Sequence, residues 1–152
     1  MALITPAYHV AVVVKDLDRA MEELGAILGV SWHVPFGGEG YQLLHGVQVP
    51  VTSRVTYSTA GPPYLELLQQ CPGSIWETTG LHHIGVWVDD WRAESARLVA
   101  AGLPVESVGV DANGEWTAGC YHSTADGLRL ELVDIGRSGP KLARYLNGGS
   151  YS

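Results

Sequence analysis

The sequence predicts an α+β fold made of two βαβββ modules, and three repeated features of the chain indicate it. Residues 9–16 (HVAVVVKD) and 83–90 (HIGVWVDD) share one pattern, which reads His, aliphatic, small, Val, any, Val, any, Asp. Each copy is followed by a segment of helical character that ends at a glycine. Each half then closes with a glutamate between leucines in a strand-like segment, at 64–68 (YLELL) and at 129–133 (RLELV). Such self-similarity is typical of duplicated supersecondary units that share one core.

The two predicted helices follow the repeated strands, at 17–29 (LDRAMEELGAILG) and at 91–102 (WRAESARLVAAG). The first helix has a regular apolar face at helical spacing, formed by Leu17, Met21, Leu24 and Leu28. The apolar face of the second helix is less regular and consists of Trp91, Leu98 and Ala101. Asp16 and Asp90 are placed to cap the helix starts, and a glycine beyond each end suits the left-handed conformation that closes a helix.

Two more strands fit between each helix and its closing strand, near 31–36 and 51–59 in the first half and near 105–109 and 116–123 in the second. The first module then spans 7–70 and the second 82–135, with a turn at Pro72 and Gly73 in the linker between them. Residues 136–152 are expected to form a tail with a short helix, KLARYL, before a Gly/Ser-rich end. A chain of 152 residues suits one compact domain that contains both modules.

Composition excludes several classes of function. The net charge is −7 with nine Lys and Arg, so the chain lacks the basic surface that nucleic acid or an anionic membrane requires. No apolar run approaches the roughly 18 to 20 residues that cross a bilayer, and no basic leader precedes the first apolar stretch, so we expect a cytoplasmic protein. The two cysteines, Cys71 and Cys120, lie too far apart in sequence to indicate a disulfide framework or a thiolate zinc site.

Strand alternation places four polar residues on the face opposite the helices. In the opening strands the aliphatic residues at alternate positions should face the helix, which leaves the histidine on the other face. In the closing strands the leucines take one face and the glutamate takes the other. If the strands of the two halves curve toward each other, one cleft is lined by His9, Glu66, His83 and Glu131.

Two neutral imidazoles and two carboxylates form a ligand set that a borderline divalent ion accepts. They leave about two of six octahedral positions free for water or substrate oxygens, as a catalytic site requires. A single histidine or glutamate in a strand is more often structural. The occurrence of an equivalent pair in each half favours the metal interpretation, and the ion could be Ni, Co, Zn, Mn or Fe. His82 is adjacent to His83 and is assigned no metal role.

Four segments resemble the vicinal oxygen chelate superfamily, which includes glyoxalase I, methylmalonyl-CoA epimerase, extradiol dioxygenases and the bleomycin and fosfomycin resistance proteins. They are HVAVVVKDLDRA, YLELLQ, LHHIGVWVDD and GLRLELVD, in order over about residues 7–135. The resemblance implies paired βαβββ modules in an eight-stranded, partly closed barrel around a metal. The ligand positions of the family fall on the four residues named above.

The resemblance also implies a chemical strategy, in which a substrate chelates the metal through two neighbouring oxygens while protein carboxylates move protons at the adjacent carbon. Glutamate at both carboxylate positions is closer to glyoxalase I than to the epimerases. Epimerases also use a separate glutamate base before the first closing strand, and no carboxylate lies between Glu39 and Glu66. Glu66 and Glu131 are therefore the candidate catalytic residues. Glu131 is expected to be the principal base, because the long first-half loop should place substrate against that half.

Substrate contacts are predicted from less specific signals. The segment 36–50 (FGGEGYQLLHGVQVP) is expected to be a glycine-rich loop at the mouth of the cleft, with Tyr41 and His45 as candidates. Tyr121 and His122 end the penultimate strand, and alternation lets only one of them face the cleft. Arg54 is the only basic residue between Arg19 and Arg92, which predicts a substrate with little negative charge.

The leading hypothesis is a metal-dependent isomerase, lyase or epimerase that transfers a proton next to a carbonyl of a small molecule. The alternatives are an iron-dependent ring-cleaving dioxygenase of the extradiol type and a non-catalytic protein that binds a drug or metabolite. The extra carboxylate argues against the dioxygenase, which uses two histidines and one carboxylate. The complete ligand set argues against the binding protein. A homodimer is expected by resemblance, with the site either within one chain or shared between two.

Overall fold

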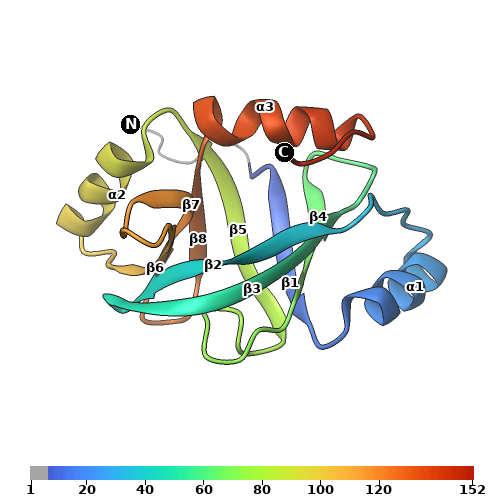
Figure 1. The fold of residues 1–152 in the computed structure, drawn as a ribbon, viewed down its shortest axis with the longest axis horizontal. Helices are drawn as coiled ribbons and strands as arrows, with labels where there is room; N and C mark the ends of the chain where they lie inside the picture. Colours follow the sequence, from blue (N-terminus) through green and yellow to red (C-terminus); the bar gives the residue numbers. More distant parts are fainter. Residues whose placement is uncertain (1–6) are drawn as a thin grey trace.

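Four strands from each half of the chain form a single barrel in the computed structural model, which describes residues 7–152 (Figure 1). The first module contains β1 (His9–Val14), α1 (Leu17–Leu28), β2 (Phe36–Leu44), β3 (Val47–Tyr57) and β4 (Tyr64–Gln69). The second module contains β5 (Gly80–Val88), α2 (Trp91–Ala100), β6 (Val105–Val110), β7 (Trp116–Ser123) and β8 (Arg129–Asp134). A third helix, α3 (Ile135–Leu146), follows β8 directly. The predicted α+β fold of paired βαβββ modules with eight strands is confirmed.

The strand order around the barrel is β1-β4-β3-β2-β6-β7-β8-β5. Within each module the opening and closing strands run parallel, β1 beside β4 and β5 beside β8. Two antiparallel pairs join the modules: β1 with β5 on one side, and β2 with β6 on the other. The second junction closes a barrel that was expected to be only partly closed.

The junction of β1 with β5 aligns the two copies of the repeated motif in opposite directions. His9 lies opposite Gly85, and Ala11 lies opposite His83. The small residue of each motif is therefore the partner of the other motif's histidine. Alternation is as predicted, since His9 and Ala11 are buried inside the barrel while Val86 of β5 packs outward in a cluster with the apolar face of α2.

Both helices begin and end as their caps predict. The carboxylates of Asp16 and Asp90 each accept a hydrogen bond of 3.0 Å from the backbone N–H three residues later. Gly29 and Gly102 adopt φ of 67° and 93°, which is the left-handed region that other residues avoid.

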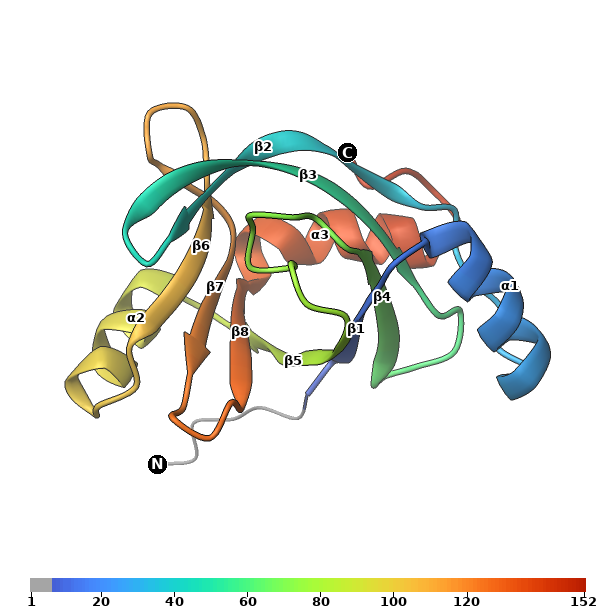
Figure 2. The same ribbon diagram turned by 90° about the horizontal axis from the view of Figure 1, so that it is seen from below.

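The two helices are not equally buried, although the sequence predicts the more regular apolar face for α1. They lie at opposite ends of the barrel, and α3 runs along one side (Figures 1 and 2). Helix α2 buries Trp91 and Leu98 against the outer face of the second module. In α1 only Leu17 is buried, and Leu28 at the other end of the predicted face is exposed.

Three expected elements differ in the structure. The strand expected near 31–36 is wrong, because 31–35 is described as a loop with one isolated bridge and β2 starts at Phe36. The predicted loop 36–50 is instead the hairpin of β2 and β3, which turns at His45 and Gly46. The tail helix is longer than KLARYL, since α3 begins at Ile135 with Asp134 as its cap.

Among the described residues, no helix combines the length and apolarity needed to cross a bilayer.

The unequal burial of α1 leads to a test of stability. Leu17→Ala removes a fully buried side chain and should lower the free energy of unfolding by about 2–5 kcal/mol. Ile27→Ala changes a side chain that is 76% exposed and should stay within about 0.5 kcal/mol of the wild type. Urea denaturation of both variants measures the difference. A comparable loss from Ile27→Ala would show that another surface covers α1 in solution.

Candidate metal centre

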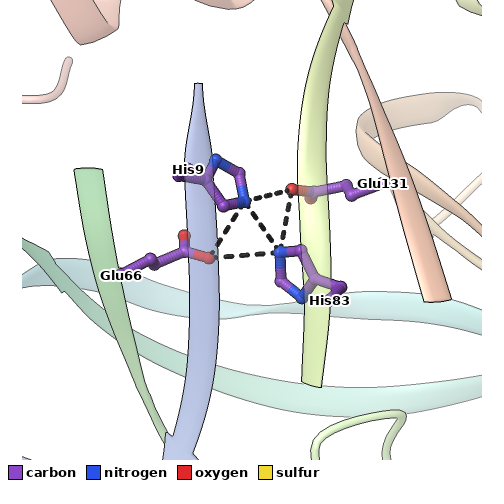
Figure 3. Close-up of side chains that lie close together, drawn as sticks. All are labelled: His9, Glu66, His83 and Glu131. Carbon is purple, nitrogen blue, oxygen red and sulfur yellow. Dashed lines mark hydrogen bonds and ion pairs between the residues drawn. The ribbon is translucent and has the colours of Figure 1, made fainter. Parts of the chain in front are cut away.

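The four predicted ligands meet at one point inside the barrel (Figure 3). They come from four adjacent strands: His9 from β1, Glu66 from β4, His83 from β5 and Glu131 from β8. Their ligand atoms all lie within 4.8 Å of one another. All four belong to one chain, so the cluster is complete without a partner subunit.

The donor atoms form a closed arrangement in which each carboxylate contacts both imidazoles. The Nε2 atoms of His9 and His83 are 2.8 Å apart. Glu66 Oε2 lies 3.3 and 3.2 Å from these nitrogens, and Glu131 Oε2 lies 3.1 and 3.2 Å from them. Ligands about 2.1 Å from a divalent ion are about 3.0 Å apart at right angles and about 3.4 Å apart at the tetrahedral angle. The spacing therefore fits donors around one ion.

Burial supports the same interpretation. The histidine side chains are 0% exposed, and those of Glu66 and Glu131 are 8% and 11% exposed. Glu66 Oε2 has no hydrogen-bond partner among the described residues, although a buried carboxylate oxygen normally has one. A cation at the centre of the cluster would satisfy this atom, so the donor set fits a divalent metal.

Two glycines make room for the ligands. A Cβ atom at Gly85, which faces His9 across the β1–β5 junction, would collide with the His9 imidazole. A Cβ atom at Gly119 in β7 would collide with the Glu131 carboxylate. Both ligand positions thus depend on neighbours that have no side chain.

His82 contacts the ligand set without joining it. Its Nδ1 lies 2.8 Å from Nδ1 of His83, and its Nε2 lies 2.8 Å from the carbonyl oxygen of Ile75 in the linker. Burial, followed by the neighbouring His83, lowers the pKa of His82 to about 4, so its ring is neutral at physiological pH. The expectation that His82 is not a metal ligand agrees with this geometry.

The charges within the cluster shift the pKa values of its members. Burial lowers the pKa of His83, but the carboxylates of Glu131 and Glu66 outweigh it and raise the pKa to about 9. Burial raises the pKa of Glu131, yet His83 and His9 hold it well below its usual value. Without a metal, the site therefore favours an ion pair with a proton on an imidazole.

The two carboxylates open onto a cavity of about 450 Å³, whose lining does not include the histidines. Three tyrosines, Tyr8, Tyr57 and Tyr121, are buried in its wall. Burial and the carboxylate charges of the cluster raise the pKa of each phenol well above its usual value. The phenols therefore stay protonated and can donate hydrogen bonds into the cavity.

Of the predicted substrate contacts, only Tyr41 and Tyr121 line this cavity. His45 lies outside this cavity, at the exposed turn of the β2–β3 hairpin with a φ of 49°. Arg54 also lies outside the cavity, because Ser53 and Val55 face inward and the Arg54 guanidinium pairs with Asp18 at 2.8 Å.

The alternation of β7 points His122 away from the cavity. Its Nε2 lies 2.9 Å from Ser95 Oγ of α2, and its Nδ1 lies 2.9 Å from the carbonyl oxygen of Leu103. Tyr121 is the member of the pair that faces the cavity, so the expectation that only one of them could do so is confirmed.

Several residues of the cavity wall were not predicted from the sequence. Tyr57 lies within the strand predicted near 51–59, opposite Glu66 in the β3–β4 register, and lines the cavity, so strand alternation applied to that segment would have identified it. Arg137 and Lys141 reach the cavity from α3, which has no counterpart in the repeat and so left no signal in it.

Comparison with known protein families agrees with the fold described above. A family model described as the glyoxalase/bleomycin resistance protein/dioxygenase superfamily matches residues 8–121. None of the curated proteins is detectably similar in sequence.

Several solved structures share the fold at low sequence identity. Methylmalonyl-CoA epimerase of Streptomyces coelicolor, in complex with 2-nitronate-propionyl-CoA, has a TM-score of 0.59 and 20% identity over 86% of this chain and 96% of its own. A methylmalonyl-CoA epimerase in complex with methylmalonyl-CoA and NH4+ has a TM-score of 0.58 and 22% identity, covering 86% and 94%. The epimerase from Mycobacterium tuberculosis has a TM-score of 0.57 and 18% identity, covering 87% and 89%.

The two site glycines predict a loss of metal binding without a change of any ligand. Gly85→Ala and Gly119→Ala should each displace one ligand and weaken binding by at least about tenfold, on the scale of changes beside metal ligands. Gly40→Ala is the matched control, because a Cβ atom there meets nothing within 4 Å. Titration with Co²⁺ measures the affinities, and equal affinity in all three variants would contradict the described packing.

The raised pKa of His83 predicts that metal binding depends on pH. A metal requires the imidazole lone pair, so binding must release the proton that the metal-free site holds below a pH of about 9. Affinity should therefore fall as pH decreases, by up to about tenfold per pH unit for one proton. Calorimetry in buffers of different protonation enthalpy counts the released protons, and a pH-independent affinity between about pH 6 and 8 would contradict this electrostatic account.

Proposed function

Because the chain belongs to the glyoxalase/bleomycin resistance protein/dioxygenase superfamily, we propose that it is a metal-dependent isomerase or lyase acting next to a carbonyl group of a small molecule. One observation carries the proposal. Two buried carboxylates, each in contact with two buried imidazoles, form part of the wall of a cavity large enough for a small substrate. Four potential metal ligands therefore meet beside the space in which a substrate would lie.

In this proposal His9, Glu66, His83 and Glu131 hold one divalent ion, which could be Ni, Co, Zn, Mn or Fe. When bound, such an ion supplies Lewis-acid stabilisation of negative charge on a substrate oxygen. The imidazoles lie behind the carboxylates and out of reach of the cavity. A substrate in the cavity would therefore approach the cluster from the side of the carboxylates.

The carboxylates are the groups that would move the proton. Glu66 and Glu131 are the only carboxylates buried in the cavity wall of the described chain, since the third lining carboxylate, Glu39, is exposed. Glu131 is proposed as the principal base. Gly37, Gly38 and Gly40 of β2 contribute no side chains to the wall, which leaves room for a substrate on the first-half side.

The wall formed by β3 argues against a strict methylmalonyl-CoA epimerase. Its residues that face the cavity are Val51, Ser53, Val55 and Tyr57, none of which can act as the separate carboxylate base of those enzymes. A base that is also a metal ligand, as in glyoxalase I, fits this wall better.

The charge of the cavity suggests a small substrate with few anionic groups. Arg137 and Lys141, one helical turn apart on α3, line the cavity and form no ion pair with any described carboxylate. Five other arginines of this acidic chain do form such pairs. Two cations without a carboxylate partner among the described residues suit one carboxylate or phosphate, whereas the several phosphates of a coenzyme A ester would find few partners.

The proposal predicts different effects for the two glutamates. Glu131→Gln should lower turnover at least about 100-fold, the scale of general-base catalysis, and should stop solvent deuterium exchange at the substrate carbon. Glu66→Gln should retain exchange. Proton NMR in deuterated buffer, with a panel of small 2-oxo and 2-hydroxy carbonyl compounds, measures this exchange.

Metal content must be measured for both variants and for the wild type. If Glu66→Gln alone stops exchange, the roles of the two carboxylates are reversed. Iron as the native metal together with no exchange in the wild type would favour the dioxygenase, and absence of any bound metal would favour a binding protein. The proposed isomerase or lyase would be refuted in either case.

A further inference from the structure

His82 forms a bridge between the linker and one metal ligand. It is buried, and both of its ring nitrogens have partners at 2.8 Å: His83 Nδ1 on one side and the Ile75 carbonyl oxygen on the other. We propose that His82 is a positioning residue that accepts a hydrogen bond from Nδ1–H of His83 and so holds Nε2 of His83 free and aimed at the metal. The inference rests on the metal site of the proposed function and goes beyond it, because it assigns a role to a residue outside the ligand set.

The protons in this bridge can be placed from its two ends. A carbonyl oxygen only accepts hydrogen bonds, so the hydrogen at the Ile75 end must be on Nε2 of His82. Nδ1 of a neutral His82 is then an acceptor, and the hydrogen between the two rings belongs to Nδ1 of His83. In the neutral His83 that metal binding requires, Nε2 then has its lone pair, and this is the atom that lies beside both carboxylates. The carbonyl at one end therefore selects the tautomer that a metal requires at the other.

The linker is built to hold the Ile75 carbonyl in place. The N–H of Ile75 donates to the side-chain oxygen of Gln42 in β2 at 3.1 Å. Ser74 Oγ donates to the Cys71 carbonyl at 2.7 Å and accepts from the Trp76 N–H at 3.0 Å. These bonds form a tight turn with a buried Ser74–Trp76 segment, so the acceptor for His82 is a rigid part of the fold.

The pseudo-symmetric ligand has no such support. Nδ1 of His9 is buried and has no hydrogen-bond partner among the residues that the structure describes. Tyr8 precedes His9 at the position that His82 occupies before His83, and its ring stacks on Trp87 with 4.1 Å between centroids. Tyr8 also packs edge-on against His9, but among the described residues only His83 has a hydrogen bond from Nδ1 to the side chain that precedes it. Loss of the hydrogen-bond partner on the second nitrogen of a ligating imidazole typically changes metal affinity by about 10–100-fold.

Two isosteric variants separate this role from a purely structural one. The side-chain oxygen of His82→Asn takes the place of Nδ1 and can still accept from His83, but the bond to Ile75 is lost. The terminal NH₂ of His82→Gln takes the place of Nε2 and can still donate to Ile75, but the acceptor for His83 is lost. Affinity for Zn²⁺, by competition with a chromophoric chelator, and the visible spectrum of the Co²⁺ form are the readouts, with circular dichroism as a control of folding.

We expect His82→Gln to weaken Zn²⁺ binding about 10–100-fold and to alter the Co²⁺ spectrum, while His82→Asn stays within about threefold of the wild type. The opposite order, with a loss in His82→Asn alone, would show that His82 only clamps the linker and would overturn the inference. Equal affinity in both variants, or a wild type that binds no divalent metal, would overturn it as well.

Nitrogen NMR of the imidazoles in the Zn²⁺-loaded wild type provides a test that needs no variant. His82 should appear as the Nε2–H tautomer and His83 as the Nδ1–H tautomer, and any other pair of tautomers would refute the bridge. These readouts are independent of turnover. A protein that binds metal with this dependence on His82 but exchanges no substrate proton would refute the proposed function and leave the inference intact.

Discussion

The antiparallel pairing of β1 with β5 is the contact on which the rest of the structure depends. It aligns two copies of one motif in opposite directions, so that His9 lies opposite Gly85 and His83 lies opposite Ala11. The imidazole of each module occupies space that the small residue of the other leaves free. Because β4 and β8 flank this pair in parallel, their glutamates reach the same point from either side. A shift of one residue in either strand would turn the histidine of that strand to the outer face of the barrel.

The electrostatic cost of this arrangement explains why a cation belongs there. Two carboxylates and two imidazoles are removed from water in the middle of the barrel, and unpaired buried carboxylates are expensive. The protein relieves the cost in part by raising the pKa of His83, which would bring a proton between the carboxylates. A divalent ion can take the place of this proton and supply a larger charge to the same oxygens. The ligand set is thus least stable when neither is present.

The two modules have the same order of strands and helix, but the elements around the site differ between them. Helix α2 is packed on its own apolar cluster, while α1 is held mainly through Leu17. The β2–β3 hairpin is longer than its counterpart and presents a glycine-rich wall to the cavity. His82 supports the second histidine, and α3 adds cations to the cavity. A pseudo-symmetric ligand cluster therefore lies in an asymmetric pocket, which allows two equivalent glutamates to have different roles.

The sequence by itself determined the paired modules, the helix caps and the four residues that meet at the cluster. These follow from local rules, namely the period-two alternation of strands, the capping positions and a repeat visible along the chain. The hairpin of β2 was not recognised, because Gly37, Gly38 and Gly40 are typical of loops and a strand with such residues depends on its neighbours. The same holds for α3, where Gly136, Gly139 and Pro140 disfavour a helix that the burial of Leu142 and Tyr145 stabilises. Only the tertiary structure decided which side chains enter the cavity and that β2 pairs with β6. It also decided that a linker carbonyl binds His82 and through it orients His83. Such contacts join residues distant in sequence, and their strength comes from burial and hydrogen-bond geometry that no local pattern records.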